Sequence, residues 1–378
     1  MIGPPSFGPI HYVPALAIKE AEIGALDGAE QAGASCTPLF FLAARAFEQP
    51  VIDAAGKPGR ERRAPTPAEV QIEVTSAVDR LLKWCNELRI ERGTHCPRFF
   101  VDVTAFDDYH SVDVLCDMMR GLANHPSAVP VFSLERPWQH ATVAGHHGAT
   151  GSGGALRLMN VPRASIQRIE RALKRCGLTM EATDLIIDFG DVTTPRGFRL
   201  LRREATVQTL AAIEYGPWRS VTVLANAMPQ KRHENADDPY DDWPLPRYDW
   251  LLWLAISREL RQLPSRIPAF GDYATRNVQN LGLMFNAPPA LLIYTGRRSW
   301  WVSRRAVRRG TADIMWKEMA ADCVAIPQFR SPAYSFFEDR VSRCARDEPL
   351  LGRYTTTEWI SAMIAHHIIY VSRTLELI

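Results

Sequence analysis

184-DLIIDFGDV-192 is a short, nearly continuous apolar run that ends in acidic residues. A strand with one face in water alternates apolar and polar residues, whereas a run of this kind fits a parallel strand buried on both faces. The runs on either side have the same character: 154-GALRLM-159 precedes it and 220-SVTVLANAM-228 follows it. The stretch therefore predicts one strand of a parallel sheet.

Further out, the same kind of run recurs at 12-YVPALAIK-19, 36-CTPLFFLA-43, 98-RFFVDVTAF-106, 128-AVPVFSL-134 and 267-IPAFGDYA-274. Segments with helical spacing lie between the runs, at 67–88, 111–123, 163–176, 199–215 and 248–263. One such run could be a turn of a buried helix, but eight in order at regular spacing are not explained that way. Eight strands alternating with helices favour a closed barrel over an open doubly wound sheet. We therefore expect residues 1–277 to form an α/β fold, a (β/α)8 TIM-like barrel.

The connections indicate where a site would lie. Segments leading from a helix into the next strand are short, as at 32–35, 92–97, 124–128 and 216–219. Segments leaving strands are long and irregular at 44–67, 135–154 and 229–250. Long loops therefore gather at the C-terminal end of the barrel, where barrel enzymes build their sites.

Beyond residue 277 the pattern changes. The stretch 289-PALLIYTGRRSWWVSRR-305 has two strand-like halves around a Gly-Arg-Arg-Ser turn, which predicts a hairpin. Helical patterns follow near 311–325, 332–345 and 356–376. We expect residues 278–378 to form a C-terminal α+β extension, a hairpin plus helices, that packs on the barrel.

The composition excludes several classes of protein. The 378 residues are 46% hydrophobic and 23% charged, which is ordinary for a globular protein. A net charge of +2 gives no global field toward nucleic acid or an anionic membrane, and no apolar stretch approaches the ~20 residues of a membrane span. The seven cysteines are scattered without a CxxC pair, and the N-terminus does not resemble a signal peptide, so we expect a cytoplasmic protein. No Walker A, GxGxxG, HExxH or GxSxG motif occurs, and we expect no cofactor.

Polar residues at the ends of buried strands are candidates for chemistry, because burying an unpaired charge is costly. Lys19 ends the first strand, and alternation places four further side chains on the inner face, namely Asp102, Arg157, Asp188 and Asp272. A satisfied charge layer that closes the core is one explanation. The other is a site for an anionic or polyhydroxylated small molecule, with Lys19, Asp188 and Asp272 as catalytic candidates and Asp102 and Arg157 as ligand-binding residues. Metal binding by the aspartates is a third, less favoured explanation, and we assign no metal.

Three other clusters are candidates that we do not favour. The glycine-rich stretch 140-HATVAGHHGATGSGG-154 has three histidines without distinctive metal spacing, so we interpret it as a flexible lid. Two basic patches, Lys57–Arg63 and the arginines from Arg297 to Arg309 around Trp300 and Trp301, have the composition of a surface that binds phosphates and stacks bases. Solvated surface charge is the commoner explanation, so nucleic-acid binding is not favoured.

Several stretches resemble the phage beta-protein family of phages and bacterial mobile elements, over nearly the full length. YVPALAIKEAEIGAL is similar to the family's strand-lysine-glutamate-helix start, and DLIIDFGDV to its strand with a terminal aspartate. FGDYA resembles its glycine-aspartate-tyrosine motif, LIYTGRRSWWVSRR its Tyr-Thr hairpin, and TTTEWISAMIAHHIIYV its terminal helix with a tryptophan and paired histidines. The chain departs from the pattern at Ile293, where the family has arginine, and lacks the glycine after the last hairpin arginine.

The resemblance adds Glu22 and Tyr273 to the expected ligand-binding residues and implies a barrel in a setting of phage conflict. It implies no reaction, so whether the chain is an enzyme stays open. Two hypotheses follow. The chain is a binding component of a phage-defence or phage/mobile-element complex with a protein partner and a charged pocket at the C-terminal end of the barrel, or it is a barrel enzyme acting on an anionic, phosphorylated or nucleotide-like small molecule. An open pocket with several convergent charges would favour the enzyme, and a filled, dry barrel mouth with a large exposed apolar patch would favour the binding component.

Overall fold

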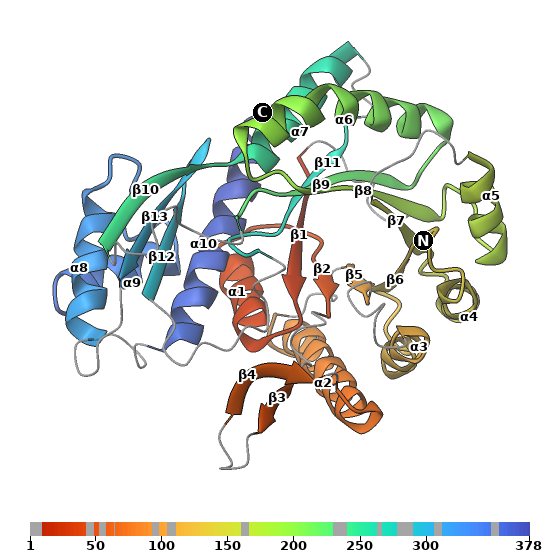
Figure 1. Cartoon of the computed structure of the whole chain (residues 1–378), viewed down its shortest axis with the longest axis horizontal. Helices are drawn as coiled ribbons and strands as arrows, with labels where there is room; N and C mark the ends of the chain where they lie inside the picture. Colours follow the sequence, from red (N-terminus) through yellow and green to blue (C-terminus); the bar gives the residue numbers. More distant parts are fainter. Residues whose placement is uncertain are drawn as a thin grey trace.

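Eight parallel strands close into a barrel within the described residues of this computed structural model, which are 10–42, 49–52, 58–63, 65–92, 98–103, 111–159, 166–229, 240–262, 267–277, 290–305, 312–348 and 355–378. The strands are β1 (Tyr12–Ala17), β2 (Leu39–Phe41), β5 (Phe99–Asp102), β6 (Ala128–Phe132), β7 (Gly154–Met159), β8 (Thr183–Asp191), β9 (Ser220–Asn226) and β11 (Ala269–Asp272). β1 pairs with both β2 and β11, and this pairing closes the barrel. The expected (β/α)8 TIM-like fold is confirmed (Figure 1).

A helix follows each of the first seven barrel strands along the chain. These helices are α1 (Glu20–Gln31), α2 (Pro67–Arg92), α3 (Ser111–Gly121), α4 (Gln139–Thr150), α5 (Ile166–Arg175), α6 (Pro195–Tyr215) and α7 (Tyr248–Glu259), the last continued by a 3-10 turn at Leu260–Gln262. They surround the barrel (Figure 1). Across the described residues, the structure shows no helix with the length and apolar content needed to cross a bilayer.

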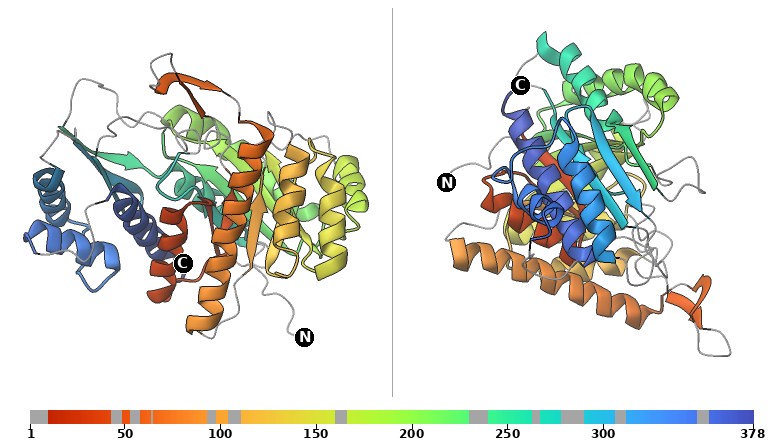
Figure 2. Two further views of the ribbon diagram at one scale, coloured as in Figure 1. Left: turned by 90° about the horizontal axis from the view of Figure 1, so that it is seen from below. Right: turned by 90° about the vertical axis from the view of Figure 1, so that its left-hand side faces the viewer.

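The last helix of the chain, α10 (Thr356–Leu375), takes the place of the eighth barrel helix. It lies against α1 and β1 (Figures 1 and 2). Gly24 of α1 helps the close approach, because a β-carbon there would lie 3.2 Å from Ser361 Oγ, whereas one at Gly28 would make an ordinary contact, 3.5 Å from Ala365 Cβ. The C-terminus therefore completes the outer layer of the barrel.

The strands bury both of their faces, which explains their continuous apolar sequences. On β1, Val13 and Ala15 belong to the core inside the barrel, whereas Tyr12 and Leu16 belong to the core between the strands and the helices. Alternation of this kind follows from the two-residue repeat of a strand. Alternate residues along a strand therefore point into different cores, one inside the barrel and one between the strands and the helices.

A smaller antiparallel sheet carries the rest of the C-terminal region. The predicted hairpin forms as β12 (Ala290–Thr295) and β13 (Ser299–Arg305), and helices α8 (Ala312–Ala325) and α9 (Phe336–Ala345) follow it. These elements have a core of their own, to which α10 adds Trp359 and Met363, while its Ile364 and Ile368 join the barrel core. The division of the chain at residue 277 stays a prediction, with α10 contributing to the cores on both sides of it.

The structure corrects the long loops expected after three strands. Residues 139–150 form α4, so the predicted flexible lid at 140–154 is wrong for most of its length. Residues 44–67 include a two-stranded ribbon of β3 (Gln49–Ile52) and β4 (Pro58–Arg63). Residues 229–250 include β10 (Tyr240–Pro246), which pairs with β13 at the edge of the small sheet.

Candidate functional site

Arg157 of β7 is the centre of a buried cluster at the C-terminal end of the barrel. Its guanidinium donates to Asp102 of β5 and to Asp188 of β8, with 3.1 Å between Nε and the Asp188 carboxylate. Its Nη2 lies 2.6 Å from the hydroxyl of Tyr273, which in turn donates to Asp188 over 2.9 Å. The structure thus brings together Asp102, Arg157, Asp188 and Tyr273, which we call the mouth cluster.

The mouth cluster satisfies most of its own charge and hydrogen-bond capacity. Burial alone would lower the pKa of Arg157, but Tyr273 and the two aspartates outweigh burial and hold it well above its usual value. Burial raises the pKa of Tyr273 well above its usual value although Arg157 opposes the rise, so the hydroxyl stays a donor. The second oxygen of Asp188 accepts from the backbone N–H of Gly190 over 2.8 Å. The carboxylate of Asp188 therefore has both oxygens engaged.

A narrow recess lies beside Tyr273, at the edge of the barrel mouth. It encloses about 200 Å³, including the part open to solvent, and is lined by Ala15, Leu16, Ala17, Glu22, Phe41, Tyr273 and Arg276. Glu22, in the first turn of α1, is 1% exposed, and neither of its carboxylate oxygens accepts a hydrogen bond within the described chain. Its nearest cation is Arg276, 3.9 Å away. The recess is the place at the mouth where a carboxylate has hydrogen-bond capacity to spare.

Lys19 lies next to this recess rather than in the mouth cluster. It is the residue before α1 and is half-buried. Burial lowers the pKa of Lys19, and the charge of Glu22 opposes the change. Of the predicted catalytic residues, Lys19 is therefore placed with Glu22 and Arg276, apart from Asp188.

Asp272 is not on the inner face, and the expectation that it joins the other mouth residues is wrong. It has the same parity on β11 as Phe270, which packs in the outer core, and it accepts hydrogen bonds from Tyr12 (2.6 Å) and Arg247 (3.4 Å). His367 of α10 lies 2.8 Å from it. The neighbouring residue Tyr273 points the opposite way, into the mouth cluster. We call Tyr12, Arg247, Asp249, Asp272 and His367 the seam cluster.

The seam cluster buries two carboxylates around one guanidinium. Arg247 is 1% exposed and lies over the rings of Trp250, Trp300 and Phe270, at 5.4, 5.5 and 5.9 Å from their centroids. Burial raises the pKa of Asp249 to about 7, against the effect of Arg247 and with that of Asp272. Burial would raise the pKa of Asp272 too, but His367 and Arg247 lower it to about 2. Two carboxylates so close cannot both ionise readily, and Asp249 is the one that keeps the proton.

From the seam cluster a buried network runs into the C-terminal elements. His367 Nδ1 lies 2.9 Å from Thr295 Oγ1, and His366 lies 3.3 Å from the Thr295 carbonyl and 2.9 Å from Glu338. Tyr294 donates to Glu338 over 3.0 Å. The Asp, Tyr-Thr and His-His residues of the motifs noted in the sequence therefore meet in one buried network that joins the barrel to the hairpin.

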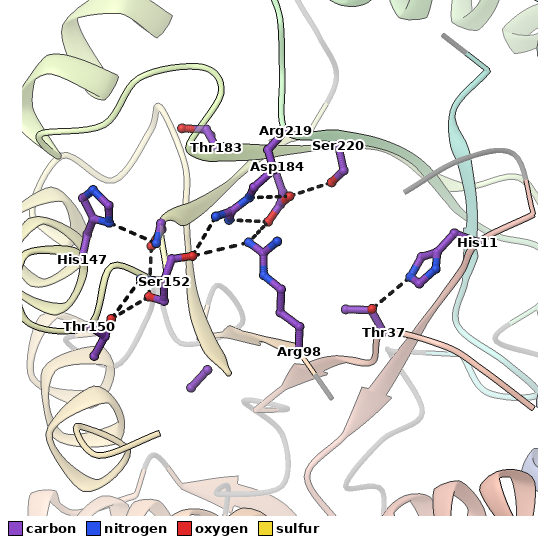
Figure 3. Close-up of polar contacts among 12 residues, drawn as sticks. His11, Thr37, Arg98, His147, Thr150, Ser152, Thr183, Asp184, Arg219 and Ser220 are labelled. Atoms are coloured by element: carbon purple, nitrogen blue, oxygen red, sulfur yellow. Dashed lines mark hydrogen bonds and ion pairs between the residues drawn. The ribbon is translucent and has the colours of Figure 1, made fainter. Parts of the chain in front are cut away.

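The opposite, N-terminal end of the barrel holds a third charge cluster, shown in Figure 3. Asp184 at the start of β8 accepts from Arg98 (2.5 Å), Arg219 (2.7 and 3.1 Å) and Ser220 (2.7 Å). Burial raises the pKa of Asp184 to about 6, and Arg98 and Ser220 oppose the rise. Polar layers at this end of a barrel serve stability rather than catalysis. This cluster was not predicted from the sequence, although Asp184 is the second residue of β8.

The histidines of α4 hold the helix to the barrel and do not form a metal site. His140 lies 3.3 Å from the Ser133 carbonyl and His146 lies 3.0 Å from the Ala128 carbonyl, and both side chains are buried. Burial lowers the pKa of each. In the part of the chain that the structure describes, no group of three or more His, Cys, Asp or Glu side chains is placed to hold a metal ion.

Part of the basic patch at the hairpin is engaged within the protein. Trp300 is fully buried and Arg305 pairs with Asp322 over 2.8 Å, whereas Trp301 is half-buried. Arg297 and Arg298 are exposed, whereas Arg308 and Arg309 lie outside the described residues. The side chains of the first patch, from Lys57 to Arg63, also lie outside the description.

Arg276, Arg247 and Asp249 were not found from the sequence. Arg276 comes three residues after Tyr273, beyond the end of β11. Arg247 and Asp249 flank the start of the apolar stretch YDWLLWLA. A charge on the apolar face of that helix was the available signal for a buried partner.

The comparisons with known proteins give one family. A family model described as Beta protein matches residues 12–373, nearly the whole chain. No curated protein and no solved structure matches the chain. The match spans the barrel, the hairpin and the last helix, including the residues of both the mouth and the seam clusters. On this match, the chain belongs to the Beta protein family.

Proposed function

We propose that the chain is the binding component of a phage-defence or phage/mobile-element complex, and that its barrel acts as a scaffold. The observation that supports the proposal is the mutual pairing of the mouth cluster among the described residues. Arg157, Asp102 and Asp188 are buried, and Arg157 donates hydrogen bonds to both aspartates. These charged side chains are therefore paired with each other within the protein. A catalytic site would instead keep one of these carboxylates available as a base.

The size of the recess supports the same proposal. Ligand pockets usually enclose roughly 300–1,000 Å³. The recess beside Glu22 is far smaller, because its outline of about 200 Å³ includes open solvent and leaves no room for a water-sized molecule. In this conformation the recess is therefore too small to hold a small-molecule ligand. The setting of phage conflict comes from the resemblance of the chain's motifs to the phage beta-protein family.

Complex formation tests the proposal. The chain would be co-expressed with each protein encoded by the genes that adjoin its own, and the products would be separated by size-exclusion chromatography. We expect one of these proteins to co-elute with the chain in a fixed ratio. Elution of the chain alone from every pairing would contradict the proposal.

A second candidate function rests on Glu22. A buried carboxylate without a hydrogen bond beside Lys19 and Arg276 would suit an anionic small molecule that also carries a donor group. Thermal unfolding with inorganic phosphate or AMP would test it, comparing the wild type with Arg276→Met. A rise in melting temperature that Arg276→Met abolishes would favour the enzyme hypothesis, and no rise with either probe would reject these ligands.

A further inference from the structure

One exposed face of α6 combines arginines with apolar side chains. Arg196, Arg199 and Arg203 are exposed, Leu200 is 69% exposed and Val207 is 47% exposed. At 100° per residue these five residues share one side of the helix, and the buried residues Ala205, Thr209 and Ile213 lie on the other. We call the exposed set the α6 face.

Arg196 of the α6 face lies in the first turn of the helix, where cations are least favoured. That turn contains no acidic residue, and a positive charge there opposes the helix dipole. Arg199 also lies three residues from Arg196 and four from Arg203, spacings at which like charges repel. None of the three forms an ion pair or a side-chain hydrogen bond within the described chain, and the nearby Glu204 is bonded to Gln208. The arginines of the α6 face therefore repel one another, and the carboxylates of an acidic partner would reduce this repulsion.

We propose that the α6 face binds an acidic, amphipathic segment of a partner protein. The proposal rests on the proposed function, since it names where the binding component receives its partner. Carboxylates of the segment would pair with Arg196, Arg199 and Arg203, and an apolar residue would cover Leu200 and Val207. Arginine suits such contacts because its planar guanidinium pairs with a carboxylate through two hydrogen bonds.

The apolar residues favour a protein over a nucleic acid. Leu200 and Val207 lie among the arginines, and burying them against a partner side chain is favourable, whereas a phosphate backbone offers little apolar surface. The aromatic residue of this segment, Phe198, is stacked on Tyr248 with 5.3 Å between the ring centroids, so it does not stack on bases. The net charge of +2 adds no general attraction for a polyanion.

Fluorescence anisotropy with a labelled probe tests the inference. The probe is a synthetic helical peptide with Glu on one side and Leu in the centre of that side, and the comparison probe is a labelled DNA duplex. We expect the wild type to bind the peptide and Arg199→Glu/Arg203→Glu to bind it roughly tenfold or more weakly, because reversing interfacial charges removes contacts and adds repulsion. Leu200→Ser should also weaken binding. Both variants should fold, since Arg199, Arg203 and Leu200 are all exposed.

Two controls make the result specific. Arg171→Glu/Lys174→Glu on α5 changes the net charge equally at exposed positions of another helix and should bind like the wild type. A peptide with Lys in place of Glu should bind Arg199→Glu/Arg203→Glu and not the wild type. The inference is overturned if the wild type does not bind the acidic peptide, if the α5 variant loses as much affinity, or if the duplex binds more tightly and Leu200→Ser has no effect.

Failure of this inference can be told apart from failure of the proposed function. In the co-expression experiment, a wild-type chain without any partner contradicts the proposed function itself. A partner that co-elutes equally with the wild type and with Arg199→Glu/Arg203→Glu leaves the proposed function standing and removes the α6 face from it.

Discussion

At the residue scale, Asp188 shows how a polar residue on a buried strand becomes part of the structure. Its partners Arg157, Tyr273 and Gly190 leave neither oxygen free. We expect Asp188→Asn to lower the free energy of unfolding by ~3–5 kcal/mol, because it leaves Arg157 buried with one anionic partner fewer. Urea unfolding measures the loss, and Glu20→Gln, at an exposed position of α1, is the control that should change little. An Asp188→Asn protein as stable as the wild type would mean that the cluster is not a structural clamp.

Asp249 gives a prediction of pH dependence. Its pKa rises from 3.8 to about 7 on folding, so the folded protein holds the proton more tightly than the unfolded chain. The resulting stabilisation is complete below pH ~4 and is lost as pH rises toward ~7, by up to roughly 1.4 kcal/mol per pH unit. Asp249→Asn stays neutral, so the stability of the wild type minus that of the variant should fall over this range and then level off. The difference is the quantity to measure, because burial lowers the pKa of His367 and of other histidines and these effects have the opposite sign. A difference that does not change with pH would contradict the raised pKa of Asp249.

Alternation along the strands predicted part of the mouth and misplaced one residue of it. Asp102, Arg157 and Asp188 meet as expected. Asp272 does not join them, because both faces of β11 are apolar and its sequence does not show which face is inward. Phe270 and Tyr273 could each have been the inner residue, and the phase was set by pairing with β1, which the sequence does not reveal.

At the element scale, α4 shows tertiary contacts overriding local propensity. Its glycines and histidines favour a mobile loop in the sequence, because each glycine within a helix lowers the stability of the helix by roughly 1 kcal/mol relative to alanine. Buried Val143 and the contacts of His140 and His146 with backbone carbonyls of the β6 region offset that cost. Such long-range contacts have no local sequence signal.

Hydrogen exchange tests this account of α4. Amides of residues 143–150 should be protected to a degree comparable with those of residues 115–121 in α3, because both helices pack on the barrel. The flexible-lid interpretation instead requires exchange at the rate of an unstructured peptide. His146→Ala should reduce the protection by removing the contact with Ala128.

The strand β10 was also missed, for a different reason. Its sequence, YDDWPLP, contains two prolines, which lack the N–H needed in the middle of a sheet. β10 is an edge strand with β13 as its one neighbour, a position where proline is tolerated. The barrel strands were predictable because strands buried on both faces have nearly continuous apolar sequences. An edge strand such as β10 has no such apolar run.

At the scale of the whole molecule, the barrel depends on the far end of the chain. α10 covers α1 and β1 and is also part of the C-terminal core. We expect a chain that stops at residue 355 to lose cooperative unfolding and to bind a hydrophobic dye, because the buried faces of α1 and β1 become exposed. Deletion of residues 376–378 is the control, since Leu377 and Ile378 are exposed and should contribute little. Cooperative unfolding of the truncated chain at the wild-type midpoint would show that the barrel is complete without α10.

The most direct test of the scaffold function replaces the charges of the mouth cluster together. Replacing one partner of a buried ion pair strands the other, whereas neutral replacement of a whole cluster is often close to neutral for stability. The variant Asp102→Asn/Arg157→Met/Asp188→Asn is therefore expected to fold, as shown by its thermal unfolding. Its co-elution with the partner protein, at matched folded concentration, is the measurement. The account predicts that the complex forms as in the wild type, and a well-folded variant that no longer forms the complex would contradict it.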